Sequence, residues 1–227
     1  MRLLQCIGVA GCLVALAIMP ARASIWTEVG AGALPGSAEL VTVPGLTEID
    51  GHLNFDGDTS QWEIDLYKIY ISDPNAFSAT TLAFDVFGNP LLIDPVLYLF
   101  SPLGQGIFMN DDTAGDNLQS TLPLYSPLRP TAPGYYLLGI GWGFSDAQSD
   151  DGSMFPLYVD SLALDGVYGP TGPGGGSPLT SWLPGGPGNF DDISSYRIAL
   201  TGVPEPGTLA LLAAAGIMAA WRRRKAN

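Results

Sequence analysis

The chain has 227 residues, and its 22 acidic residues against nine Lys and Arg give a formal net charge of −13. Hydrophobic residues make up 47% of the chain, which is enough to form a buried core. Nucleic acid is excluded as a partner because the middle of the chain offers almost no basic residues to bind phosphate. A charge of this sign suits cations or a hydrated anionic matrix, and it also keeps a protein soluble.

Residues 1–23 have the organisation of a secretory signal peptide. A charged start, an apolar core and a small-x-small site follow one another as Arg2, residues 3–19 and Ala21-Arg22-Ala23. Cleavage is expected between Ala23 and Ser24. A lipoprotein cleavage box ending at Cys12 is the alternative, but the apolar run before it is short and contains Gln5.

Residues 24–202 are predicted to form one secreted domain, a length that supports a proper core. Three basic residues, Lys68, Arg129 and Arg197, stand there against 21 acidic residues, which is a net charge of −18. Both cysteines, Cys6 and Cys12, lie in the signal peptide. The domain therefore depends on its core, with metal as a further source of stability, because no disulfide is available.

The domain is predicted to be an all-β antiparallel sandwich. Short β-branched and aromatic runs alternate with Gly, Pro, Asn and Asp, and helix signals are almost absent. Strands are expected near residues 39–43, 63–71, 81–87, 96–100, 106–109, 134–141, 155–159 and 196–200.

Two of these runs predict burial in different ways. Large apolar residues alternate over 82–86, which predicts a strand buried on one face. Residues 96–100 are apolar on both faces, as in a central strand. The Ser101-Pro102-Leu103-Gly104 turn then predicts a hairpin from Val96 to Met109.

Residues 166–188 are rich in glycine and proline. This composition predicts a long surface loop without regular structure. Deleting residues 171–177 should then change the stability little, because loop-closure entropy depends weakly on length.

Four short motifs in the middle of the chain together resemble the bacterial pre-peptidase C-terminal (PPC) domain. They are Asp65-Leu66-Tyr67, residues 94–100, Asn110-Asp111-Asp112 and residues 133–138. The resemblance covers about residues 49–143, with 196–200 as the closing strand. It implies a jelly-roll-like β-sandwich of a kind that serves secreted enzymes as a targeting or substrate-binding module. This chain departs from that arrangement, because no catalytic domain accompanies the module.

No catalytic motif stands out, and the chain is predicted not to be an enzyme. The chain has no Gly-x-Ser-x-Gly motif to supply a nucleophile for its single histidine, His52. His52 is therefore interpreted as a surface residue at a strand end. The chain has no phosphate-binding Gly-rich loop followed by lysine. A glycoside hydrolase that uses two of the 21 carboxylates remains an alternative.

Carbohydrate binding is a second alternative. Trp182 lies among Pro and Gly residues and is the best candidate for an exposed platform on which a sugar ring can stack. Trp62 and Tyr135 lie in predicted strands and are expected in the core instead.

A calcium site is predicted at Asn110, Asp111, Asp112 and Asp116. These residues place three carboxylates and one amide oxygen within seven positions, after a predicted strand. Closely spaced oxygen donors on a turn are the ligands that Ca²⁺ prefers. The alternative is a solvated turn rich in Asp and Asn.

The last 25 residues form a three-part tail. Val203-Pro204-Glu205-Pro206 is followed by an uncharged run at 207–221 and by a basic block at 222–225. The run is short for a transmembrane helix, and basic residues after it mark the cytoplasmic side. Pro204, Glu205 and Pro206 before such a run resemble the PEP-CTERM sorting signal of Gram-negative bacteria. The resemblance implies recognition and cleavage by an exosortase; a permanent membrane anchor is the alternative.

The sequence therefore predicts a secreted, non-enzymatic protein that is exported across the inner membrane and held there transiently by its tail. After cleavage it is expected at the cell surface or in the exopolysaccharide (biofilm) matrix. A polysaccharide-binding module is the alternative function, and a carboxylate-based hydrolase is a further one.

Overall fold

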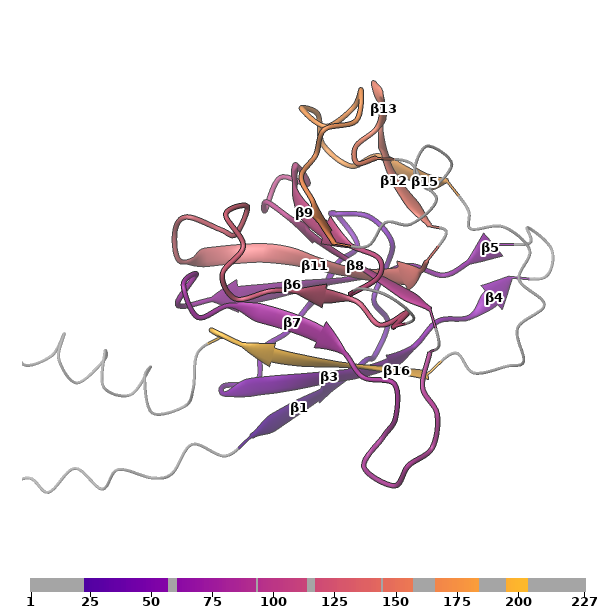
Figure 1. The fold of residues 1–227 in the computed structure, drawn as a ribbon, viewed down its shortest axis with the longest axis vertical. Coiled ribbons are helices and arrows are strands. Elements are labelled where there is room, and N and C mark those ends of the chain that lie inside the picture. The colour runs from indigo at the N-terminus through magenta and orange to yellow at the C-terminus, as the bar shows by residue number, and fades with distance from the viewer. Residues whose placement is uncertain are drawn as a thin grey trace, which may run out of the picture.

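The structure is a computed structural model, and it describes residues 23–56, 61–92, 94–113, 117–143, 145–156, 166–183 and 195–203. Every regular element of these residues is a β-strand. Two sheets of five and six strands form the body, and Figure 1 shows them as two layers of strands. The prediction of an all-β sandwich is confirmed.

The five-stranded sheet has the order β1-β3-β16-β7-β10. Strand β1 pairs with β3 in parallel, and the other neighbours are antiparallel. The bounds are β1 Ser24–Thr27, β3 Leu46–His52, β16 Ser195–Thr201, β7 Ser78–Thr81 and β10 Thr121–Leu122.

The six-stranded sheet has the order β14-β9-β8-β11-β6-β2. Only β2 and β6 pair in parallel. The bounds are β14 Val167–Tyr168, β9 Gly106–Asn110, β8 Pro95–Phe100, β11 Gly134–Trp142, β6 Asp65–Ile71 and β2 Glu39–Leu40. Two small sheets join β12 Asp146–Ser149 to β13 Gly152–Ser153 and β15 Ser181–Leu183, and β4 Phe55–Asp56 to β5 Gln61–Trp62.

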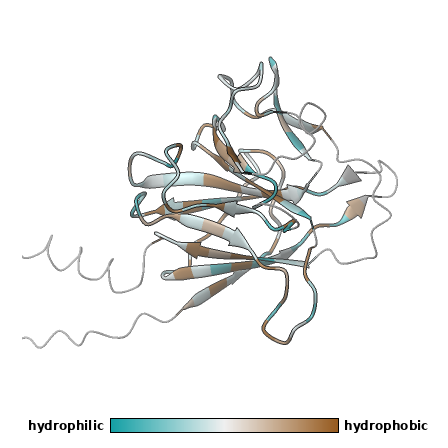
Figure 2. Ribbon diagram, in the orientation of Figure 1, coloured by the Kyte–Doolittle hydropathy of each residue, from teal (hydrophilic) through white to brown (hydrophobic). Residues whose placement is uncertain are grey.

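The main core fills the space between the two large sheets. Ile49 and Ile198 enter it from the five-stranded sheet, and Ile69, Leu97 and Leu138 enter it from the six-stranded sheet. Each of these side chains is fully buried. Apolar and polar residues follow each other along the strands (Figure 2), as expected where one face of a sheet meets the core.

A second apolar cluster covers the other face of the six-stranded sheet. Tyr98 and Phe100 of β8 pack there against Phe155, with ring centroids 5.5 and 6.1 Å away. Strand β8 is therefore buried on both faces, as its sequence predicted. The predicted hairpin is also confirmed, because β8 pairs antiparallel with β9 from Leu97↔Asn110 to Phe100↔Gly106.

The strand predicted at residues 81–87 is wrong for most of its length. Strand β7 ends at Thr81, and the chain then forms a projecting loop closed by the Leu91 N–H, which donates to the Ala83 carbonyl at 2.9 Å. The Asp85 carboxylate accepts the backbone N–H groups of Phe87 and Asn89 at 2.8 Å. This local bonding competes with the strand, as Asp side chains do in turns, and leaves Phe87 86% exposed.

The prediction of an unstructured loop at 166–188 is wrong for its described part, 166–183. Strand β14 pairs with β9, and β15 pairs with β12. Between them the Gly172 N–H donates to Met154 O at 3.1 Å, and the Gly174 N–H donates to Ser153 O at 2.8 Å. Glycine serves close backbone packing here, since a Cβ at Gly175 would lie 1.9 Å from the Pro170 carbonyl oxygen.

The strand predicted at 155–159 is described only for residues 155 and 156, which form no strand, and the rest lies outside the described residues.

We expect Gly175→Ala to destabilise the fold by about 1–3 kcal/mol, because overpacking against backbone cannot relax cheaply. Gly176→Ala is the matched control, since nothing lies within 4 Å of a Cβ at Gly176. Urea unfolding of the two variants measures the difference. Equal stability of both would show that residues 172–176 do not pack as the structure has them.

Candidate metal centre and sorting tail

Sheet topology brings three acidic segments to one end of the six-stranded sheet. Strand β8 lies between β9 and β11 and runs antiparallel to both. The start of β8 therefore faces the ends of its two neighbours. Asp94 precedes β8, Asp111 and Asp112 follow β9, and Asp146 lies just beyond the end of β11.

The first three of these residues form a compact carboxylate cluster. Asp94, Asp111 and Asp112 each offer an oxygen atom, and these atoms lie within 4.8 Å of one another. Gly143 makes room for them, because a Cβ there would lie 2.6 Å from Asp94 Oδ1 and 3.0 Å from Asp111 Oδ1. The Gly143 N–H also donates to the Asp94 carbonyl oxygen at 2.8 Å.

The centre of the cluster is buried. Asp111 is 2% exposed, and its Oδ1 atom has no hydrogen-bond partner among the described residues. Burial, with the nearby charges of Asp94, Asp112 and Asp146, raises the pKa of Asp111 to about 8. Burial also raises the pKa of Asp94 to about 6, assisted by Asp112, and that of Asp146 to about 6. The fold therefore gathers half-buried acidic groups around the buried carboxylate of Asp111, where water solvates negative charge poorly.

Hydrogen bonds to neighbouring backbone fix the loop that carries Asp111 and Asp112. The Asn110 side chain donates to the carbonyl oxygens of Asp112 and Gly166 at 2.7 and 2.5 Å, and its own oxygen accepts the Thr121 N–H at 2.5 Å. The Ser120 hydroxyl donates to the carbonyl oxygens of Asp111 and Pro95. The amide group of Asn110 is thus bonded to backbone groups on both its nitrogen and its oxygen, and it holds the loop in place.

The spacing of the carboxylate oxygens in the cluster is compatible with a calcium ion. Ca²⁺ binds oxygen at 2.3–2.6 Å, so two oxygens on one ion lie at most about 5 Å apart. The separations among Asp94, Asp111 and Asp112 satisfy this limit. The unpartnered oxygen of Asp111 is also the kind of atom that a cation would satisfy.

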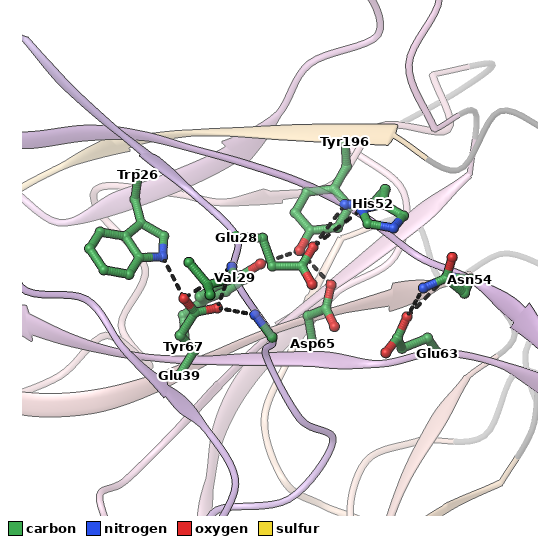
Figure 3. A network of polar contacts seen from close by, with 11 residues as sticks. Trp26, Glu28, Val29, Glu39, His52, Asn54, Glu63, Asp65, Tyr67 and Tyr196 are labelled. Atoms are coloured by element: carbon green, nitrogen blue, oxygen red, sulfur yellow. Dashed lines mark hydrogen bonds and ion pairs between the residues drawn. The ribbon is translucent and has the colours of Figure 1, made fainter.

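A second polar cluster joins the two large sheets inside the core (Figure 3). The Tyr67 and Tyr196 hydroxyls bond to each other, and Tyr196 OH donates to Asp65 Oδ2 at 2.6 Å. Asp65 is fully buried, and burial raises its pKa to about 8, with the Tyr196 hydrogen bond opposing the shift. At neutral pH Asp65 is therefore mainly protonated, and the cluster is a neutral bridge between β6 and β16.

Two glutamates beside this bridge hold the first strand. Glu39 accepts the Trp26 indole N–H and the Val29 N–H, each at 3.2 Å (Figure 3). Glu28 accepts the His52 N–H at 3.0 Å. The strand β1 begins at Ser24, directly after the expected cleavage site at Ala23, so the described fold contains the predicted mature start.

The sorting tail begins where the last strand ends. After β16 the chain turns at Gly202, whose φ is 72° and whose carbonyl accepts the N–H groups of Ser72 and Asp73 at 2.9 and 3.1 Å. Val203 is 7% exposed and is the last described residue. The family model of the PEP-CTERM protein-sorting motif matches residues 202–225.

The chain carries a PEP-CTERM sorting motif. This motif implies export and sorting by an exosortase to the cell surface of a Gram-negative bacterium. No curated protein matches the chain. The processing residues Pro204, Glu205 and Pro206 and the apolar run at 207–221 lie outside the described residues, and within those residues no helix is long and apolar enough to cross a membrane.

The residues that the sequence predicted for a calcium site are only partly brought together. Asp111 and Asp112 meet in the cluster, and Asp116 lies outside the described residues. Asp94, the third member of the cluster, was not predicted, although it stands directly before the apolar strand β8. The predicted hairpin from Val96 to Met109 was a signal for Asp94. The residues just before the first strand of a hairpin and just after its second strand lie opposite each other.

The aromatic predictions had mixed outcomes. Trp182 is half-buried rather than an exposed platform, because its ring packs edge-on against Tyr98 and Phe100 and its Nε1–H donates to Ala33 O at 2.7 Å. Trp62 is buried as predicted. Tyr135 is 46% exposed and was wrongly predicted in the core, because it lies on the outer face of β11. His52 ends β3 at the surface, as predicted.

Proposed function

We propose that this PEP-CTERM protein is a non-enzymatic component of the cell surface or of the extracellular polysaccharide matrix. The observation that carries the proposal is the sorting motif itself, which begins one residue after the last strand of the sandwich. An exosortase that cleaves at this point releases the sandwich alone. Its charge of −18 suits a hydrated anionic environment in which cations link acidic groups.

Calcium belongs to this proposal as a structural ion. Asp94, Asp111 and Asp112 would hold it, and Asp146 would lie near enough to add to the field of negative charge. The ion would supply positive charge to carboxylates whose mutual repulsion otherwise opposes folding. Extracellular modules typically bind Ca²⁺ with dissociation constants on the order of 10⁻⁴–10⁻³ M, so the site would fill outside the cell.

A non-enzymatic role is supported by the surroundings of the reactive groups. His52 Nδ1 lies 3.7 Å from Glu28 Oε2 on the surface, and no described serine hydroxyl bonds to the imidazole. Asp65 is shielded from solvent and bonded within the core. Carbohydrate stacking on Trp182 loses its main support because that ring packs against β8.

The test is fractionation of the producing bacterium with and without its exosortase. We expect the protein in the surface and matrix fraction of the wild type, and in the inner-membrane fraction when the exosortase gene is deleted. Free protein in the medium of both strains would contradict retention in the matrix. A membrane location in both strains would contradict exosortase sorting.

A further inference from the structure

Both processed ends of the domain lie at the same end of the sandwich. Strand β1 runs parallel to β3, and β16 runs antiparallel to it. The start of β1 at Ser24 and the end of β16 at Thr201 therefore lie at the same end of the sheet, on either side of the start of β3. The Ser24 N–H donates to Gly45 O at 3.1 Å, which fixes this start beside the segment 40–46. Figure 1 shows β1 starting and β16 ending on the same side of the molecule.

An apolar groove opens at this end. Its volume is about 350 Å³, and it is lined by residues 40–44 and by Leu46, Ile69, Tyr70, Tyr135 and Val203. Leu40 is 48% exposed, and Tyr70 and Tyr135 are 39% and 46% exposed. The two tyrosine rings meet edge to face with centroids 5.3 Å apart. None of the lining residues is charged, although the domain carries a net charge of −18.

The distance from this groove to the membrane is limited by the sequence. Only residues 204–206 separate Val203 from the apolar run that begins at Gly207. Four extended Cα–Cα steps cover at most about 14 Å. The headgroup layer on one side of a bilayer is itself roughly 5–8 Å thick. When the run at 207–221 is inserted, Val203 and the groove that it lines must therefore lie against the headgroups.

We propose that this groove docks on the outer surface of the inner membrane before the exosortase cuts the tail. Tyr70 and Tyr135 would enter the interfacial layer, where aromatic rings with a polar end are favoured. The patch lacks carboxylates, so it avoids the repulsion that other faces of this acidic domain would meet at anionic lipids. Docking ends with cleavage, because the domain then has no tether. The inference rests on the membrane insertion of the tail that the proposed function assumes.

The projecting loop at residues 82–91 provides an internal control. It is tied to the start of β16, since Leu82 N–H donates to Arg197 O at 3.0 Å. Arg197 lies four residues before the end of β16 at Thr201, a separation of about 13 Å along a strand. Phe87 at the tip of the loop is 86% exposed and apolar, so it would also report unspecific contact with lipid.

The experiment uses residues 24–227, the chain without its signal peptide, which contains no cysteine and keeps the tail, reconstituted in phosphatidylcholine vesicles. A single Thr42→Cys, in the wall of the groove and exposed, or a single Phe87→Cys carries a polarity-sensitive fluorophore. Lipids with a nitroxide in the headgroup region are the quencher. We expect at least threefold stronger quenching of the label at position 42 than at position 87. Tyr70→Ser/Tyr135→Ser should lower the quenching at position 42 without reducing flotation of the chain with the vesicles.

Other outcomes overturn the inference in distinguishable ways. Equal quenching at the two positions in floating vesicles would remove the docking face while leaving sorting by the tail intact. Shielding of position 42 only after addition of exosortase would assign the groove to the enzyme. If the label at position 42 becomes shielded as the protein concentration rises in the absence of lipid, the groove binds a second copy of the chain. A chain that does not float with vesicles would contradict both this inference and the proposed function.

Discussion

The Asp65→Asn variant is expected to gain stability over the wild type as the pH rises from about 5 to 8. Burial raises the pKa of Asp65 from 3.8 to about 8 in the folded state. Between these values the folded protein keeps a proton that the unfolded chain releases. Its stability therefore falls as the pH rises through this window. Asparagine does not titrate, so the variant lacks this loss.

The size of the effect follows from proton linkage. A difference of one bound proton changes the unfolding free energy by about 1.4 kcal/mol per pH unit. We expect the free-energy difference between Asp65→Asn and wild type to move by about 2–3 kcal/mol in favour of the variant between pH 5 and pH 7. The variant can be less stable than the wild type at pH 5, because an asparagine amide at this buried place lacks one hydrogen-bond partner. The test is therefore the change of the free-energy difference with pH.

Urea unfolding at pH 5, 6, 7 and 8 in EDTA, at fixed ionic strength, measures this change. The carboxylate cluster titrates in all variants and cancels in the comparison. Asp150→Asn is the matched control, since Asp150 is exposed, and its curve should run parallel to that of the wild type. A parallel curve for Asp65→Asn would mean that Asp65 is ionised in the fold at pH 5.

Calcium is expected to stabilise the wild type at pH 7.5 by up to about 2.7 kcal/mol. This is the linkage value for a ligand at a hundredfold excess over its dissociation constant, reached by 10 mM CaCl₂ if that constant is about 10⁻⁴ M. The physical reason is the cluster of Asp94, Asp111 and Asp112, whose oxygens lie within 4.8 Å of one another. Asp111→Asn removes the buried carboxyl group that can ionise to bind the ion, and should lose most of the calcium effect.

Thermal unfolding in EDTA and in CaCl₂, with NaCl adjusted to equal ionic strength, separates binding from screening. Asp150→Asn removes an exposed acid and should keep the full calcium shift. Asp94→Asn tests the cluster member that the sequence did not predict, and it should behave like Asp111→Asn. Equal shifts in all four proteins would place the effect in general charge screening and leave the cluster without a specific ion.

The sequence predicted what depends on local pattern. The apolar run at 96–100 predicted a strand buried on both faces, and the turn after it predicted the β8–β9 hairpin; both are confirmed. Alternation at 82–86 predicted a strand that does not form, because the Asp85 side chain bonds to nearby N–H groups. Alternation shows what a strand could bury, but not whether a partner strand is there.

What the sequence missed depends on long-range packing. The glycines at 172, 174 and 175 were interpreted as part of a loop without regular structure. Instead Gly172 and Gly174 allow close backbone packing on β13, and Gly175 allows it on Pro170. Asp94 joins Asp111 only through strand register, so spacing along the chain pointed to Asn110 and Asp116 instead. The likeness to a PPC domain stays a prediction. The sorting tail was found because its residue order and spacing act locally, and the motif match confirms it.

The intact mass of the protein recovered from the cell surface tests the account most directly. A chain that begins at Ser24 and ends close to Pro204-Glu205-Pro206 is predicted, with the signal peptide and the basic block at 222–225 both absent. Surface-exposed protein that still carries residues 207–225 would contradict exosortase sorting and leave a permanent membrane anchor in its place.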